Sequence, residues 1–243
     1  MPVRRALCLA LALILAGQTA GADAFRDARY IEPTERYPHG VLGDTVEHGA
    51  LEVTRSDGVR LAARLDPSLV FEDTAPRLVD LDGDGAPEVI TVEAHQRHGA
   101  RLSVWGSGES ALERLAVTPF IGTRFRWLGV VGAADLDGDG AVEIAYVDRP
   151  HLARILRVWR YDAQGARPRL IEIATAQGHT NHRIGERDIA GGVRNCDGPA
   201  EMLTASPDWS RMLATRIEAG RLSTRVIGRE TSRRAFRAAL ACP

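Results

Sequence analysis

Four stretches of the chain alternate apolar and polar residues on either side of a glycine-containing turn. They run over Leu51–Leu65, Arg101–Val117, Ile155–Ile173 and Met212–Ile227. Alternation with a period of two is typical of strands that bury one face, and a turn between two such strands makes an antiparallel hairpin. We therefore predict four β-hairpins, with turns at Ser56-Asp57-Gly58, near Gly106–Ser110, near Gln164-Gly165 and at Ala219-Gly220.

A second pattern recurs ahead of three of these hairpins. Asp80–Glu93 reads DLDGDGAPEVITVE and, 55 residues later, Asp135–Asp148 reads DLDGDGAVEIAYVD. A decayed third copy, VRNCDGPAEMLTAS, covers Val193–Ser206. One unit thus consists of a short strand, an acidic loop, a second strand and a hairpin.

Units of four strands that recur along a chain are the signature of a β-propeller, in which each unit forms one blade. We predict an all-β, propeller-like domain over residues 23–243, with about four blades. The blades are expected at approximately 37–70, 71–120, 121–178 and 179–228.

The two ends of this domain are less regular. The first unit lacks the acidic loop, so we expect Tyr37–Val46 to supply its inner strands. A fifth blade, built irregularly from Phe25–Gly43, stays open as an alternative. In the tail, residues 229–243, only Ser232–Ala241 has a helical pattern.

The two acidic loops have the composition of calcium sites. Calcium takes about six to eight hard oxygen ligands, whereas magnesium is disfavoured because it keeps several of its waters. Gly85 and Gly140 permit the sharp turn that such a loop needs. The predicted ligands are Asp80, Asp82, Asp84, the Ala86 carbonyl and Glu88 in one loop, and Asp135, Asp137, Asp139, the Ala141 carbonyl and Glu143 in the other. We therefore predict two calcium ions.

These loops differ from an EF-hand. An EF-hand needs an acidic residue at the twelfth loop position and helices on both sides. Thr91 and Tyr146 occupy that position here, and the flanking EVITV and EIAYV segments are strand-like. The sequence therefore predicts calcium loops between strands.

The third copy has lost the acidic pattern. Val193, Asn195 and Asp197 align with the three aspartates of the other loops. Without the first carboxylate, calcium binding is expected to be lost. We predict a disulfide between Cys196 and Cys242 in place of a third ion.

With DLDGDGxxEI repeated at a spacing of 55 residues, the chain resembles the FG-GAP and VCBS repeats found in the integrin α-chain propeller and in many exported bacterial proteins. The resemblance covers Asp44–Gly228 and implies a propeller with calcium held at the blade loops. Such propellers usually have about seven blades. This chain is too short for that number, so a ring of four or five blades, or an open partial propeller, is expected.

The first residues have the features of a signal peptide. Arg4 and Arg5 precede an apolar run, Ala6–Ala16, that is too short to span a bilayer, and small residues follow it. We expect residues 1–22 to be removed, the rest to be periplasmic or secreted, and no transmembrane anchor after processing. Export would place Cys196 and Cys242 in an oxidising compartment, where pairing is the expected state.

Loops at the end of the predicted blades opposite to the acidic loops are rich in histidine, arginine and tryptophan. Such groups gathered on one face suit an anionic or sugar-like ligand, although ordinary solvated loops have a similar composition. A zinc site is disfavoured because the histidines are far apart in the sequence. The candidate ligand residues are His95, Arg126, Arg149, His151, His179, His182, Arg183 and Trp209.

The chain has no GxSxG, HExxH or P-loop motif, so we predict no catalytic residue. A net charge of −1 argues against nucleic-acid binding. We predict a calcium-stabilised binding or scaffolding module that recognises a protein or glycan in the cell envelope. The alternatives are a small periplasmic hydrolase or lyase, with His151 and His182 as general-base candidates, and a purely structural envelope protein.

Overall fold

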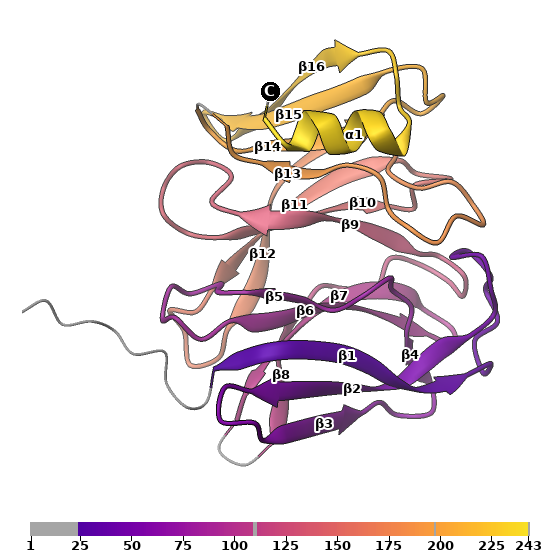
Figure 1. Ribbon diagram of the computed structural model, residues 1–243, viewed down its shortest axis with the longest axis vertical. Helices are drawn as coiled ribbons and strands as arrows, with labels where there is room; N and C mark the ends of the chain where they lie inside the picture. The colour runs from indigo at the N-terminus through magenta and orange to yellow at the C-terminus, as the bar shows by residue number, and fades with distance from the viewer. Residues whose placement is uncertain (1–23, 109–110, 197, 243) are drawn as a thin grey trace, which may run out of the picture.

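The computed structural model describes residues 24–108, 111–196 and 198–242. These residues form antiparallel β-sheets and one short helix. The sheets lie on top of one another along the long axis of the molecule (Figure 1). The predicted all-β fold is confirmed.

The N-terminal half forms one sheet of eight strands, with the order β1-β2-β4-β6-β7-β8, in which β3 pairs with β2 and β5 pairs with β6. The strands are β1 (Phe25–Thr34), β2 (Glu47–Arg55), β3 (Arg60–Arg64), β4 (Leu69–Phe71), β5 (Arg77–Val79), β6 (Glu88–His95), β7 (Gly99–Ser107) and β8 (Leu112–Val117). The short strand β4 joins its two halves, because Phe71 pairs with His48 of β2 and with Glu93 of β6.

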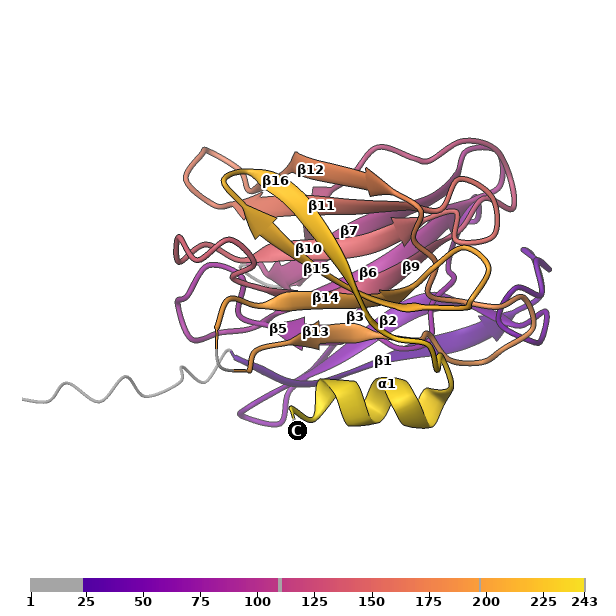
Figure 2. The ribbon, with the colours of Figure 1, turned by 90° about the horizontal axis from the view of Figure 1, so that it is seen from above.

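The C-terminal half forms two sheets of four antiparallel strands. The first contains β9 (Leu128–Ala134), β10 (Glu143–Asp148), β11 (Ile155–Asp162) and β12 (Arg169–Gln177). The second contains β13 (Gly192–Arg194), β14 (Glu201–Ala205), β15 (Met212–Glu218) and β16 (Arg221–Gly228). Helix α1 (Arg233–Leu240) lies against one edge of the last sheet (Figure 2).

All four predicted hairpins are present. They are the pairs β2–β3, β7–β8, β11–β12 and β15–β16. The helix is also confirmed: it begins after Ser232, whose hydroxyl accepts a hydrogen bond from the Ala235 N–H. Local sequence patterns were sufficient for these elements.

The prediction for the first unit is wrong. Tyr37–Val46 contains no strand, because Pro38 lacks a backbone donor and Gly40 and Gly43 have φ values of 69° and 94°. The edge strand comes instead from β1, which pairs along its length with β2. Within Phe25–Gly43 the structure has one strand, β1, and its pairing with β2 means that this stretch forms no sheet of its own.

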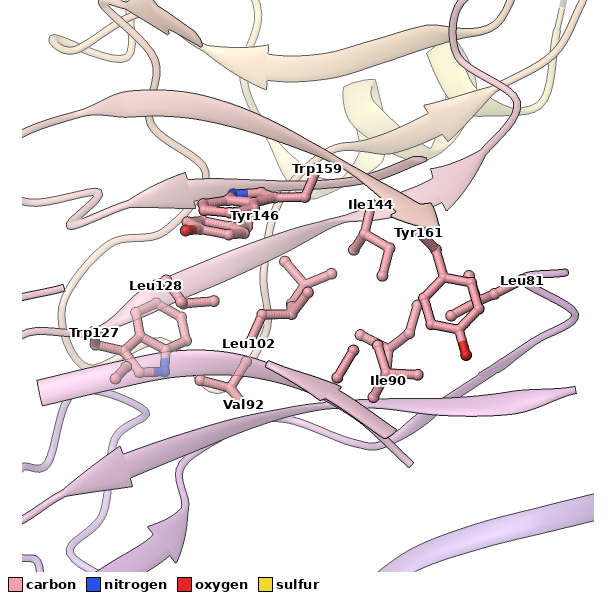
Figure 3. Packing of buried hydrophobic residues seen from close by; sticks show 14 of the residues in the cluster. Leu81, Ile90, Val92, Leu102, Trp127, Leu128, Ile144, Tyr146, Trp159 and Tyr161 are labelled. Atoms are coloured by element: carbon pink, nitrogen blue, oxygen red, sulfur yellow. The ribbon is translucent and has the colours of Figure 1, made fainter. Parts of the chain in front are cut away.

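The sheets are held together by apolar side chains that project from both faces of the central strand β10. Ile144 and Tyr146 join a buried cluster with Ile90 of β6 (Figure 3). Ala145 and Val147, at the alternate positions, join a second cluster that reaches the β13–β16 sheet. Successive side chains of a strand point to opposite faces, so β10 connects its sheet to both neighbours.

Two sequence predictions concern the ends of the chain. The disulfide is confirmed: Cys196 and Cys242 are bonded, which ties the end of the chain to the β13–β14 connection. The predicted signal peptide, residues 1–22, lies outside the described residues. Among the described residues, no helix is long and apolar enough to cross a bilayer.

Replacing Cys196 with serine is expected to lower the free energy of unfolding by about 4 kcal/mol. The disulfide closes a loop with a sequence separation of 46, and its loss frees that loop in the unfolded chain. Urea unfolding of oxidised wild type and of Cys196→Ser measures the difference. Reduced wild type should match the variant; equal stability of the oxidised and reduced wild type would contradict the prediction.

Candidate metal and ligand sites

Two loops gather acidic side chains. We call residues 80–88 the first acidic loop, which connects β5 to β6, and residues 135–143 the second acidic loop, which connects β9 to β10. In each loop, one carboxylate oxygen from each of three residues lies within 4.8 Å of the others. The two groups are Asp80, Asp82 and Glu88, and Asp135, Asp137 and Glu143.

The first acidic loop is curled by hydrogen bonds to its own carboxylates. Asp80 accepts from the N–H groups of Gly83 at 2.8 Å and Gly85 at 3.0 Å. Glu88 accepts from the N–H of Leu81 at 2.9 Å. Both glycines have positive φ, which they adopt without strain. The DxDxDG pattern therefore sets the shape of the loop.

The second acidic loop repeats these contacts. Asp135 accepts from the N–H groups of Gly138 at 2.7 Å and Gly140 at 3.0 Å. Glu143 accepts from the N–H of Leu136 at 2.9 Å. The two loops thus have the same backbone framework.

Not all predicted ligands belong to these groups. Asp84 and Asp139 lie outside the groups of three and accept hydrogen bonds from the N–H of Ala86 at 2.7 Å and of Ala141 at 2.9 Å. The structure therefore brings together three predicted carboxylates per loop. The carbonyls of Ala86 and Ala141 stay predicted ligands.

Sequence reasoning missed a cation at the second acidic loop. Arg160 of β11 contacts Asp137 at 2.6 Å, Asp139 at 2.9 Å and Glu143 at 2.8 Å. It lies there because Glu143 and Arg160 are cross-strand partners. Arg160 lies within the predicted Ile155–Ile173 hairpin, but only the register between β10 and β11 shows that it faces the acidic loop.

The glutamates that open the second strand of each unit have different electrostatic environments. Burial raises the pKa of Glu88 to about 7, and the negative charges of Asp82 and Asp84 add to the effect. Burial also raises the pKa of Glu143, but Arg160 opposes the rise. Of these two carboxylates, Glu143 has an arginine that offsets its burial, and the described residues provide Glu88 with none.

In the decayed third copy, arginines surround the glutamate at the start of the second strand. Glu201 of β14 contacts Arg194 at 2.6 Å, Arg216 at 2.7 Å and Arg225 at 2.6 Å. Burial raises the pKa of Glu201, but these cations outweigh it and hold the pKa below its usual value. Asp197 lies outside the described residues.

The stretch that spans both acidic loops is similar to a known repeat family. Residues 80–146 match the model of the FG-GAP-like repeat. This FG-GAP-like segment begins at Asp80 and ends at Tyr146 in β10, so it includes both acidic loops and confirms the resemblance found in the sequence. No curated protein matches the chain.

Outside the acidic loops, the candidate ligand residues fall into separate groups. His95 stacks on His98, with ring centroids 4.6 Å apart. The Arg183 guanidinium lies 3.8 Å from the centre of the Trp209 ring. His179 is buried and its Nδ1 lies 2.9 Å from the hydroxyl of Thr204.

One pocket, of about 310 Å³, brings several candidates together. Arg126, Arg149 and His151 line it, beside Trp127. His39 also lines it and was missed, because no local motif marks a loop side chain whose partner, the buried Glu72, follows a strand 33 residues away in the sequence. The pocket thus combines cationic or protonatable groups with an aromatic ring.

Burial lowers the pKa of His39, His151 and His179 to about 4. In the unfolded chain a histidine titrates near pH 6.5, so the unfolded state binds more protons between pH 6.5 and 4. The stability that depends on these neutral rings is therefore lost as the pH falls through this window.

His179→Gln is expected to remove about 2–3 kcal/mol of the stability difference between pH 7 and pH 4. The measurement is urea unfolding at both pH values in the presence of a chelator, which excludes effects of metal. His98→Gln, at an exposed position, is the control. Parallel pH dependences of His179→Gln and wild type would contradict the prediction.

Proposed function

We propose that this chain is an exported binding module that is stabilised by calcium and recognises a protein or glycan of the cell envelope. The observation that carries the proposal is the first acidic loop, where three carboxylates meet at the start of the FG-GAP-like segment. A metal at this position would stabilise the connection between two strands and would take no part in chemistry.

The donors of the first acidic loop fit calcium. Asp80, Asp82 and Glu88 offer hard carboxylate oxygens from one curled loop, which is the ligand type that calcium prefers. A cavity of about 200 Å³ adjoins them and is lined in part by Asp82, Asp84 and Glu88. A cation there would offset the cost of holding several negative charges together in a partly buried place.

The arrangement of strands supports a propeller-type domain. The meanders β5–β8, β9–β12 and β13–β16 each have four antiparallel strands and stack through apolar faces. We assign them as blades, with β1–β4 as an irregular first blade joined to the second. Since each acidic loop connects the first two strands of a blade, the candidate ligand loops emerge at the other end.

Two features support export. The disulfide between Cys196 and Cys242 fits an oxidising compartment, where such bonds form and persist. The apolar run Ala6–Ala16 behind Arg4 and Arg5 has the composition of a signal peptide. We therefore place the protein in the periplasm or outside the cell.

The loops that carry the candidate ligand residues, which we call the ligand face, are better suited to binding than to hydrolysis. His151 and His182, the candidate general bases, contact each other at 3.1 Å, and the second ring nitrogen of His182 lies 2.8 Å from the Glu186 carbonyl. Both nitrogens of His182 are therefore engaged. Arg126 and Arg149 beside Trp127 instead offer cationic and aromatic contacts to an anionic or sugar-like group.

Calcium is expected to raise the midpoint of thermal unfolding, and magnesium is expected to raise it less. An ion that binds only the folded protein adds about 2.7 kcal/mol of stability at 100 times its Kd. Asp82→Ala should lose this response, whereas Asp27→Ala, at an exposed position on β1, should keep it. Identical melts in calcium and in chelator would contradict the calcium part of the proposal.

The binding part is tested with Arg126→Glu. The wild-type chain is expected to bind a defined set of glycans or envelope proteins on an array, and the charge reversal should weaken that binding at least about tenfold. Arg169→Glu, exposed at the end of the β9–β12 sheet that carries the acidic loop, is the matched control. Equal binding by both variants would exclude the pocket as the binding site. If the wild-type chain binds none of the glycans or proteins, the proposed binding function is wrong.

A further inference from the structure

The three glutamates that open the second strands occupy equivalent positions but face different partners. Pairing of Glu143 with Arg160 places an arginine opposite the second glutamate. Met202 pairs with Thr215, so the next position of that ladder, opposite Glu201, is Arg216. Val89 pairs with Trp105, so the residue opposite Glu88 is Gly106. The residue opposite the glutamate is therefore a glycine at Glu88 and an arginine at both Glu143 and Glu201.

At the second acidic loop, the arginine contacts Asp137 and Glu143, two of the three carboxylates that could hold a metal. The guanidinium of Arg160 touches three carboxylates, those of Asp137, Asp139 and Glu143, at 2.6–2.9 Å. These contacts use all of its nitrogens, Nε, Nη1 and Nη2. A guanidinium stays charged at every physiological pH, so this compensation is permanent.

At the first acidic loop, no arginine stands opposite the glutamate, and a terminal carbon of Leu115 lies where a Cβ of residue 106 would be. Gly106 has no side chain, and the cavity of about 200 Å³ lies beside Asp82, Asp84 and Glu88. Within the described ranges, the Glu88 carboxylate has no arginine partner and its one hydrogen bond comes from Leu81 N–H. The acidic residues are the same in both loops, but only the second has an internal cation.

We infer that the two acidic loops are not equivalent: the first binds calcium, whereas Arg160 supplies the positive charge of the second. This inference rests on the proposed calcium function and refines it from two ions to one. An ion held by Asp135, Asp137 and Glu143 would compete with the charge-assisted contacts that Arg160 makes to two of these carboxylates, and it would meet the like charge of Arg160. In the third unit the chain again supplies the positive charge, because Glu201 has three arginine partners.

Calcium stoichiometry tests the inference. Isothermal titration of the full chain with calcium should give one ion per chain for wild type. Asp82→Ala should abolish this binding, and Asp137→Ala should leave it at one ion. Arg160→Met should raise the number to two, because it frees the second loop while keeping an unbranched side chain. Arg169→Met, which removes an exposed arginine from the neighbouring strand β12, should leave one ion.

The reverse substitution places an arginine at the first loop. Gly106→Arg should reduce calcium binding at least about tenfold and reduce the rise of the thermal midpoint with calcium accordingly. The terminal carbons of Leu115 must shift to admit the new side chain. Circular dichroism therefore accompanies the titration, and Gly106→Met controls for the added bulk and should still bind one ion.

The outcomes distinguish failure of this inference from failure of the proposed calcium function. Two ions in wild type, or one ion in Arg160→Met, would overturn the inference and leave a calcium-binding module. No ion in wild type and none in Arg160→Met would overturn the calcium function together with the inference. One ion in wild type that Asp137→Ala removes and Asp82→Ala does not would overturn the assignment of the loops.

Discussion

The charge of one buried glutamate per unit is the constraint on which these loops depend. Glu88, Glu143 and Glu201 are 6%, 0% and 3% exposed, and a buried carboxylate is costly unless an opposite charge lies close to it. In two units the same carboxylate accepts the N–H of Leu81 or Leu136, so it also fixes the turn of the acidic loop. Arg160 and the three arginines around Glu201 offset this cost for two of the carboxylates, whereas burial raises the pKa of Glu88 to about 7.

The charge at these glutamates also affects how the sheets pack against each other. Leu81, held by Glu88, belongs to the buried cluster between the N-terminal sheet and the β9–β12 sheet. Leu136, held by Glu143, belongs to the cluster between the β9–β12 and β13–β16 sheets. A cation at either loop therefore supports the interface on which that leucine packs. With Arg160 at the second loop, the chain itself supplies a cation at the interface nearer the C-terminus; in the proposed function, calcium supplies it at the other.

Much of the fold could be read from the sequence, because hairpins and the DxDxDG turns are determined by neighbouring residues. The alternation around Gly58 and the acidic repeat at Asp80 are signals of this local kind. The first unit could not be read in this way, since β4 is three residues long and is defined only by its partners. The same reason hid Arg160 and His39: both become functional candidates through contacts with residues distant in the sequence, which no local motif records.

The acidic loops and the ligand face lie at opposite ends of the same strands, which connects the two halves of the proposed function. Strand β6 runs from Glu88 to His95, and β10 runs from Glu143 to Asp148, directly before Arg149. A strand buried along its length transmits the position of one end to the other, because its side chains cannot shift without opening the core. Strand β10 thus leads from the loop that Arg160 neutralises to Arg149, which lines the pocket of about 310 Å³. In the proposed function, β6 leads instead from the loop that calcium holds to His95, so removal of calcium would affect the His95 end of the face and leave the pocket at Arg149 in place.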